Sequence, residues 1–139
     1  MPNALSKARP DLGLLVLRVG LAVIVLFHGV YKLSHGVDWM HGPLGAHGLP
    51  FFLAYGTYVA EVVAPVLLLV GAATRVSGLI IAFDLLGAIY LARADAVTKI
   101  GGGGGWAIEI EAAIFFMGLA VACTGPGAYR LVKTPPPWD

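Results

Sequence analysis

Four apolar stretches make up more than half of this chain of 139 residues, and each contains at least one ionisable residue. They cover, approximately, Leu12–Leu33, Phe51–Gly71, Val76–Ala92 and Trp106–Thr124. A hydrocarbon core about 30 Å thick needs roughly 20 helical residues to cross it. The first, second and fourth stretches fit this length, and the third is slightly short. The sequence therefore predicts an all-α integral membrane protein, an antiparallel four-helix bundle that forms a single domain over residues 1–139.

The composition agrees with a membrane protein and excludes several other classes. Hydrophobic residues make up 58% of the chain and charged residues 12%, whereas charged residues are about a quarter of an ordinary soluble domain. The net charge of +1 and the lack of a long Lys/Arg block exclude a basic nucleic-acid-binding surface. The single cysteine, Cys123, rules out an intrachain disulfide or a CxxC redox pair. The expected partner from this composition is the lipid bilayer. Protein subunits of a larger membrane complex, or further copies of this chain, are the other expected partners.

The distribution of basic residues predicts the orientation. With the N-terminus inside, the inner side holds more of them (Lys7, Arg9, Arg75, Arg130 and Lys133) than the outer side (Lys32, Arg93 and Lys99). The positive-inside rule then places both termini in the cytoplasm, in the cell inner (plasma) membrane. The apolar run that follows Lys7 and Arg9 is longer than a signal-peptide core, so we expect it to be retained as the first span.

Four further patterns carry structural expectations. Small residues recur four apart and let helix backbones approach closely in lipid: Gly56, Ala60 and Ala64; Gly78 and Ala82; Gly118 and Ala122. The connection Ala72–Arg75 is short enough to make a tight antiparallel hairpin of the second and third spans. The glycine run Gly101–Gly105 predicts a mobile loop, and the tail at Pro135–Pro137 is expected to be extended and exposed.

Arg18, Asp84 and Glu61 are expected to form an inner polar layer. Counted from the inner ends of the spans, they lie about 9, 12 and 15 Å deep. Arg18 is expected to pair with Asp84 or Glu61, either as a structural ion pair or with the surplus carboxyl handling protons. Pro65, four residues after Glu61, removes the hydrogen bond to the Glu61 carbonyl and favours a small polar cavity there.

His28 and Glu109 are expected to form an outer polar layer, because both fall at about 24 Å on the same scale. Either the headgroups hydrate them, or they bind a quinone carbonyl and exchange its proton. Glu111 lies on nearly the opposite helix face from Glu109, so at most one of the two is expected to face the bundle.

Metal and other cofactor signatures are weak. The loop histidines His35, His41 and His47 have a six-residue spacing that matches no zinc site and are expected to be surface residues. No haem, flavin or metal is indicated, and a quinone is the cofactor that the second alternative for His28 and Glu109 would require.

Four sequence pieces occur in a recognisable order. They are LRVGLAVIVLFHGVYKL, YVAEVVAPVLLLVGAATR, the glycine-rich loop followed by WAIEIEAA, and GPGAY near the end. Together they resemble the DoxX family of small four-helix membrane proteins. The family often ends near a GPG-x-x-S-x-D pattern, whereas this chain reads GPGAYRLVKT, so a role for that acid cannot be carried over.

The resemblance implies a membrane-embedded accessory to redox enzymes, with members linked to quinone-dependent sulfur oxidation, oxidative stress complexes and quinone detoxification. By position, Arg18, Glu61 and one of Glu109 or Glu111 match the polar positions of the family. The first expected function is a quinone-interacting subunit that depends on a partner for electrons, so that an enzymatic role would be as an oxidoreductase subunit. The alternatives are a non-catalytic anchoring subunit of a larger complex and a small proton-coupled transporter.

Overall fold

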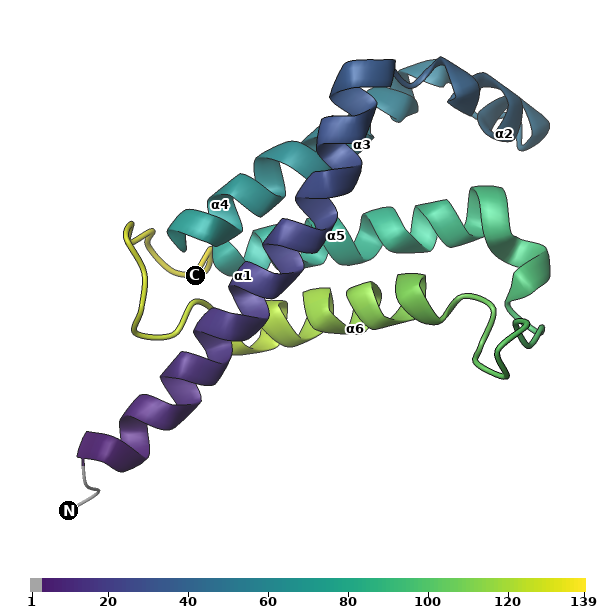
Figure 1. Cartoon of the computed structure of the whole chain (residues 1–139). Helices are drawn as coiled ribbons and strands as arrows, with labels where there is room; N and C mark the ends of the chain where they lie inside the picture. The colour runs from purple at the N-terminus through teal and green to yellow at the C-terminus, as the bar shows by residue number, and fades with distance from the viewer. Residues whose placement is uncertain (1–3) are drawn as a thin grey trace.

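The computed structural model describes the backbone of residues 4–139 and the side chains from Pro10 onward. Over these residues the fold is all-helical, without a named strand, and residues Ile100 and Trp106 form an isolated antiparallel bridge. Four long helical segments follow one another along the chain (Figure 1). The elements are α1 (Ala4–His35), η1 (Asp38–Met40), α2 (His41–Ala46), η2 (Phe51–Tyr55), α3 (Gly56–Tyr58), η3 (Val59–Val63), α4 (Ala64–Val70), α5 (Thr74–Ala88), η4 (Ile89–Arg93), η5 (Ala94–Ala96) and α6 (Glu109–Thr124).

Three of the four segments are long and apolar enough to cross a membrane: Pro10–His35, Phe51–Val70 and Thr74–Ala96. The expectation that the third stretch is short is wrong, because its helix begins at Thr74 and continues through the π-helical turn η4. The fourth segment, α6, is instead the shortest, with 16 residues. It begins only at Glu109 because Trp106 pairs with Ile100 rather than joining the helix.

The second and third segments form the expected tight hairpin. Only three residues separate α4 from α5, and Gly71 and Ala73 both have positive φ angles, 77° and 44°. Glycine tolerates this left-handed conformation at little cost. The chain therefore reverses direction at once, and α5 returns alongside α4.

The core is apolar and lies between the long segments. Its buried members come from α1, α4, α5 and α6: Leu21, Ala22, Val25, Ala64, Leu68, Ile81, Ile114 and Val121. Helices α5 and α6 pack closely, since a Cβ atom added to Gly78 would lie 2.6 Å from the Gly118 carbonyl oxygen. The small residues predicted to allow close approach are confirmed at this contact.

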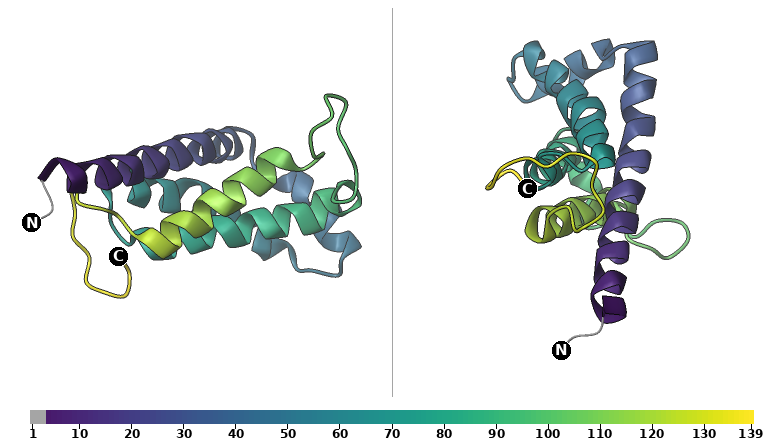
Figure 2. Two further views of the ribbon diagram at one scale, coloured as in Figure 1. Left: turned by 90° about the horizontal axis from the view of Figure 1, so that it is seen from below. Right: turned by 90° about the vertical axis from the view of Figure 1, so that its left-hand side faces the viewer.

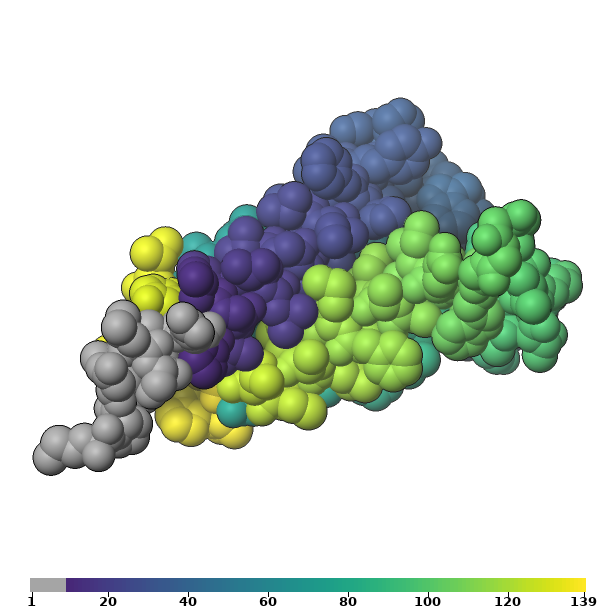
Figure 3. All heavy atoms as spheres, turned by 60° about the horizontal axis from the view of Figure 1, so that its bottom comes forward, coloured from purple at the N-terminus to yellow at the C-terminus, as the bar shows by residue number. Residues whose placement is uncertain are grey.

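The two ends of the molecule differ. The N-terminal end of α1 and the C-terminal tail lie at one end, which we call the tail end (Figure 2). The segment η1–α2 and the glycine-rich loop lie at the opposite end, which we call the loop end. Figure 3 shows α1 and α6 side by side across one face, with the glycine-rich loop beyond α6.

Helix α1 approaches the second segment at Gly29. Pro65 has no amide hydrogen to donate, so the Glu61 carbonyl loses its ordinary helical partner. The backbone is π-helical over Val59–Val63. A Cβ atom at Gly29 would overlap the Glu61 carbonyl oxygen and would lie 2.8 Å from a Val62 methyl group. Glycine at position 29 therefore sets the spacing between α1 and η3.

Replacing Gly29 by alanine is expected to destabilise the protein by about 1–3 kcal/mol, because the backbone of η3 must move to admit the methyl group. Thermal unfolding in detergent measures the effect. Gly20→Ala in the same helix is the matched control, because a Cβ atom there meets nothing within 4 Å. Equal melting temperatures for the two variants would contradict the packing argument.

Candidate functional site

A polar cavity of about 730 Å³ opens at the loop end, between α1, η3, α5, α6 and the glycine-rich loop. Seven ionisable residues line it: His28, Lys32, Glu61, Asp84, Arg93, Glu109 and Glu111. The structure thus brings together His28, Glu109, Glu61 and Asp84 from the set of residues singled out in the sequence, and it leaves Arg18 elsewhere.

The strongest contact in the cavity joins α1 to η3. The Lys32 ammonium lies 2.6 Å from Glu61 Oε1, and the two side chains are 15% and 11% exposed. The hydroxyl of Tyr58 donates a hydrogen bond to the Lys32 carbonyl at 3.3 Å. Glu61 Oε2 is buried and has no hydrogen-bond partner among the described residues. One carboxylate oxygen is therefore available to a donor that enters the cavity.

Asp84 of α5 faces the same pair. Its side chain is half-buried, and it interacts electrostatically with both Glu61 and Lys32. The Lys32 ammonium is therefore the nearby positive charge for two carboxyl groups, those of Glu61 and Asp84. A carboxylate without its own counter-ion is costly in a membrane-spanning segment unless water or a further donor reaches it.

Lys32 is the residue that sequence reasoning missed. The sequence predicts it only as one of the basic residues on the outer side of the membrane. The available signal was its position one helical turn after His28, which places both side chains on the same face of α1. The glutamate it neutralises lies on the neighbouring segment at the level of Gly29, within reach of a lysine side chain.

The predicted pairing of Arg18 with Asp84 or Glu61 is wrong. Arg18 is 1% exposed, and its guanidinium donates hydrogen bonds to the carbonyls of Pro126 at 2.7 Å and Tyr129 at 2.6 Å. On α1, Arg18 lies beside Gly71, whereas Glu61 lies beside Gly29. These positions on α1 are eleven residues, or roughly 17 Å, apart. The depth estimate failed because it assumed that the inner ends of the spans are level, whereas α1 extends beyond α4 at the tail end.

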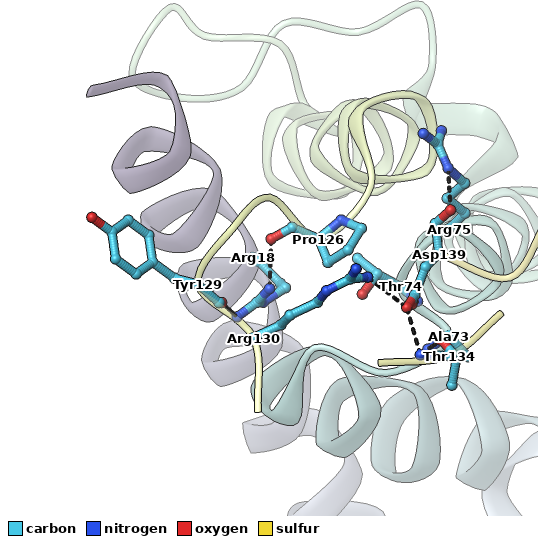
Figure 4. A network of polar contacts seen from close by, with 9 residues as sticks. All are labelled: Arg18, Ala73, Thr74, Arg75, Pro126, Tyr129, Arg130, Thr134 and Asp139. Atoms are coloured by element: carbon cyan, nitrogen blue, oxygen red, sulfur yellow. Dashed lines mark hydrogen bonds and ion pairs between the residues drawn. The ribbon is translucent and has the colours of Figure 1, made fainter. Parts of the chain in front are cut away.

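Arg18 belongs to a second polar cluster, at the tail end (Figure 4). Arg130 binds Asp139 Oδ2 at 2.8 Å, and the Thr134 amide donates to the same oxygen at 2.8 Å. Arg75 donates from Nε to the Asp139 main-chain oxygen at 2.8 Å. The prolines of the tail are exposed, as expected, and anchored residues flank them.

Charge also holds this cluster together. Burial alone would raise the pKa of Asp139, but hydrogen bonds from Thr134 and Thr74 and the charge of Arg130 outweigh it, so the pKa is lowered. A lowered pKa in the folded state stabilises the fold above the ordinary pKa of the group. This contribution is lost as the pH falls through the lowered value.

The first turn of α6 places two glutamates at the polar cavity. The Glu109 carboxylate folds back against Gly105, where a Cβ atom would overlap it. Glu111 pairs with Arg93 at 3.5 Å. Both residues line the cavity, Glu109 as an exposed residue and Glu111 as a half-buried one. That at most one of the two glutamates faces the bundle stays a prediction.

The glycine-rich loop forms one wall of the cavity as a narrow turn. The Gly101 amide donates to the Gly105 carbonyl at 2.8 Å, and the Ala107 amide donates to the Lys99 carbonyl at 3.1 Å. The Trp106 indole donates to the Val97 carbonyl at 2.7 Å. Mobility of this loop stays a prediction.

The loop histidines lie apart from one another. His35 stacks on Tyr31, His41 stacks on Phe51, and His47 packs against Tyr90. Within the part of the chain that the structure describes, no group of three or more His, Cys, Asp or Glu residues is placed to share a metal ion.

Replacing Arg18 by methionine is expected to lower the melting temperature, because the buried Pro126 carbonyl and the partly buried Tyr129 carbonyl lose their donor. The expected cost is about 1–3 kcal/mol for each unpaired group. The tail should also become sensitive to limited proteolysis. Lys133→Met, at an exposed residue of the same tail, is the control and should leave both properties unchanged.

Comparison with known proteins supplies the family. The DoxX family model matches residues 13–94, from α1 to η5, and so includes Lys32, Glu61 and Asp84. A Bacillus subtilis (strain 168) protein described as "Putative oxidoreductase CatD" is 36% identical over 86 residues, which cover 62% of this chain and 63% of that protein. The alignment thus spans less than two thirds of the length of this relative. No solved structure matches. The match over more than half of the chain shows that this membrane protein belongs to the DoxX family.

Proposed function

We propose that this chain is a quinone-interacting membrane subunit of a redox complex, and that it receives electrons from a partner protein. The observation that carries the proposal is the polar cavity, which gathers an imidazole, an ammonium and several carboxyl groups between apolar helices. The description of the Bacillus subtilis relative as an oxidoreductase is consistent with this class of activity.

The chemistry of the cavity suits a quinone head. A quinone has two carbonyl oxygens that accept hydrogen bonds, and Lys32 and His28 are potential donors at the cavity wall. Reduction to the quinol takes up two electrons and two protons. The electrons come from the partner protein, and the protons come through groups that can hold them, namely His28, Asp84 and Glu109.

The proposed location is the cell inner (plasma) membrane. The proposed topology has four membrane crossings, with both termini in the cytoplasm. The positions of the N-terminal helix and the C-terminal tail at one end support an even number of crossings. Helix α6 is about 24 Å long at the usual helical rise. It is shorter than the hydrocarbon core, so the bilayer would have to thin or the flanking residues would have to reach outward.

A pair of introduced cysteines tests the fourth crossing. Gly103→Cys lies in the glycine-rich loop and Lys133→Cys in the tail, both in a Cys123→Ser background. If α6 crosses the membrane, a membrane-impermeant thiol reagent should label Gly103→Cys from outside and Lys133→Cys only after lysis. Labelling of both from the same side would mean that α6 does not cross.

Quinone binding to the purified protein tests the function. His28→Ala and Glu109→Gln should each raise the Kd for a short-chain ubiquinone about three- to tenfold, the effect of losing one hydrogen bond. Glu111→Gln should have a smaller effect, because Arg93 already engages that carboxylate. His41→Ala is the matched control, since His41 stacks on Phe51 and does not line the polar cavity.

Purification in mild detergent, followed by mass spectrometry of the bound quinones and proteins, separates the proposed function from the two alternative functions. Stoichiometric protein partners without bound quinone would favour an anchoring subunit, in which Lys32–Glu61 is a structural ion pair. The absence of both would favour a proton-coupled transporter. Unchanged Kd values in the His28 and Glu109 variants would remove the polar cavity as the quinone site.

A further inference from the structure

A second cavity, of about 670 Å³, adjoins the polar cavity. It lies between the connection that follows α1, the segment η2–α3 and one face of α5. Both cavities fall in the range of about 300–1,000 Å³ that is typical of small-molecule sites. Lys32, Trp39, Asp84 and Ala88 line both cavities, so the two cavities meet at these four residues, which we call the neck.

The lining of the second cavity is apolar away from this neck. Its walls include Met40, Leu44, Leu53, Ile80 and Leu91. The hydroxyl of Thr57 is already satisfied, since it donates to the Ala54 carbonyl at 2.8 Å. A hydrocarbon chain is therefore the chemical class that suits this space, because it leaves no buried polar group without a partner.

The second cavity also opens toward the apolar surface of α5. Leu79 and Phe83 line it and are 44% and 72% exposed. Both residues belong to a segment that is long and apolar enough to cross a membrane. A hydrocarbon chain can therefore enter laterally from the bilayer.

The charge of the polar cavity limits the head that such a chain can carry. Two cationic residues, Lys32 and Arg93, line it beside four acidic residues, Glu61, Asp84, Glu109 and Glu111. An excess of carboxyl groups disfavours a phosphate head, because like charges repel in a poorly hydrated site. A neutral head that accepts hydrogen bonds avoids this repulsion.

We propose that the joined cavities bind one long-tailed quinone, with its head in the polar cavity and its isoprenoid tail in the apolar cavity. The inference rests on the proposed function and adds that the quinone carries a long isoprenoid tail with its own binding site. Lys32, Trp39 and Asp84 surround the point where head and tail join.

Two glycines allow the tail cavity to be filled selectively. Gly56 of α3 and Gly87 of α5 line the apolar cavity and not the polar one, and a Cβ atom at either position meets nothing within 4 Å. Leucine at either position should occupy tail space without disturbing the backbone. Gly20→Leu in α1 is the matched control, because its surroundings are equally open and it lines neither cavity.

The test is photo-crosslinking in lipid nanodiscs, with a long-chain ubiquinone analogue that carries a diazirine near the end of its tail. Mass spectrometry should find the label on residues of the apolar cavity, and an excess of unlabelled long-chain ubiquinone should remove it. Labelling should fall about tenfold in Gly87→Leu and Gly56→Leu, since the added side chain overfills the space. It should be unchanged in Gly20→Leu.

Binding of a short-chain ubiquinone is measured on the same samples and should be unaffected by the leucine variants. If the wild-type protein binds the short-chain ubiquinone but the tail label spreads over lipid-facing residues, the tail site is wrong and the proposed function stands. If the wild-type protein binds no short-chain ubiquinone, both proposals fail. If a diazirine phosphatidylglycerol labels the apolar cavity and long-chain ubiquinone does not displace it, the occupant is a lipid and the tail site for quinone is overturned.

Discussion

The ion pair between Lys32 and Glu61 is the interaction on which the loop end of the molecule depends. It joins α1 to the π-helical segment η3 at 2.6 Å, next to the point where Gly29 meets the Glu61 carbonyl. Removing one member would leave a charge buried among apolar helices, at a typical cost of about 3–5 kcal/mol. The same residue, Glu61, thus sets the helix spacing through its main chain and the polarity of the cavity through its side chain.

Much of the fold could be predicted from local patterns in the sequence. Apolar length indicated the spanning segments, and the four-residue spacing of small residues indicated the close contact at Gly78 and Gly118. The pairing of buried charges could not be predicted in this way. It depends on the axial offset between neighbouring helices. Helix α1 extends beyond α4 at the tail end, and no local sequence pattern predicts the size of this offset. His28, Glu61, Asp84 and Glu109 nevertheless line one cavity at the loop end, where Glu61 is buried, Asp84 is half-buried and His28 and Glu109 are exposed, whereas Arg18 lies at the tail end.

Arg18 and Arg75 show how main-chain carbonyls can satisfy much of the hydrogen-bonding capacity of an arginine in a membrane protein. Arg18 donates to the carbonyls of Pro126 and Tyr129, and Arg75 donates to those of Ala122 and Cys123 at the end of α6. Carbonyls at a helix C-terminus lack helical donors and carry partial negative charge, so they attract cations. The tail beyond α6 is therefore fixed by main-chain acceptors as much as by Asp139.

The π-helical turn at Val59–Val63 gives this segment a property that straight helices lack. A π turn accommodates one residue more than an α turn, so the residues before and after it are out of α-helical phase by about 100°. Deleting a single residue from this turn would let the backbone relax to a regular helix, and one half of the segment would rotate relative to the other. Glu61 could not then face Lys32 while Leu68 stays in the core. The position of Glu61 opposite Lys32 thus depends on the extra residue of the π turn as well as on the choice of side chains.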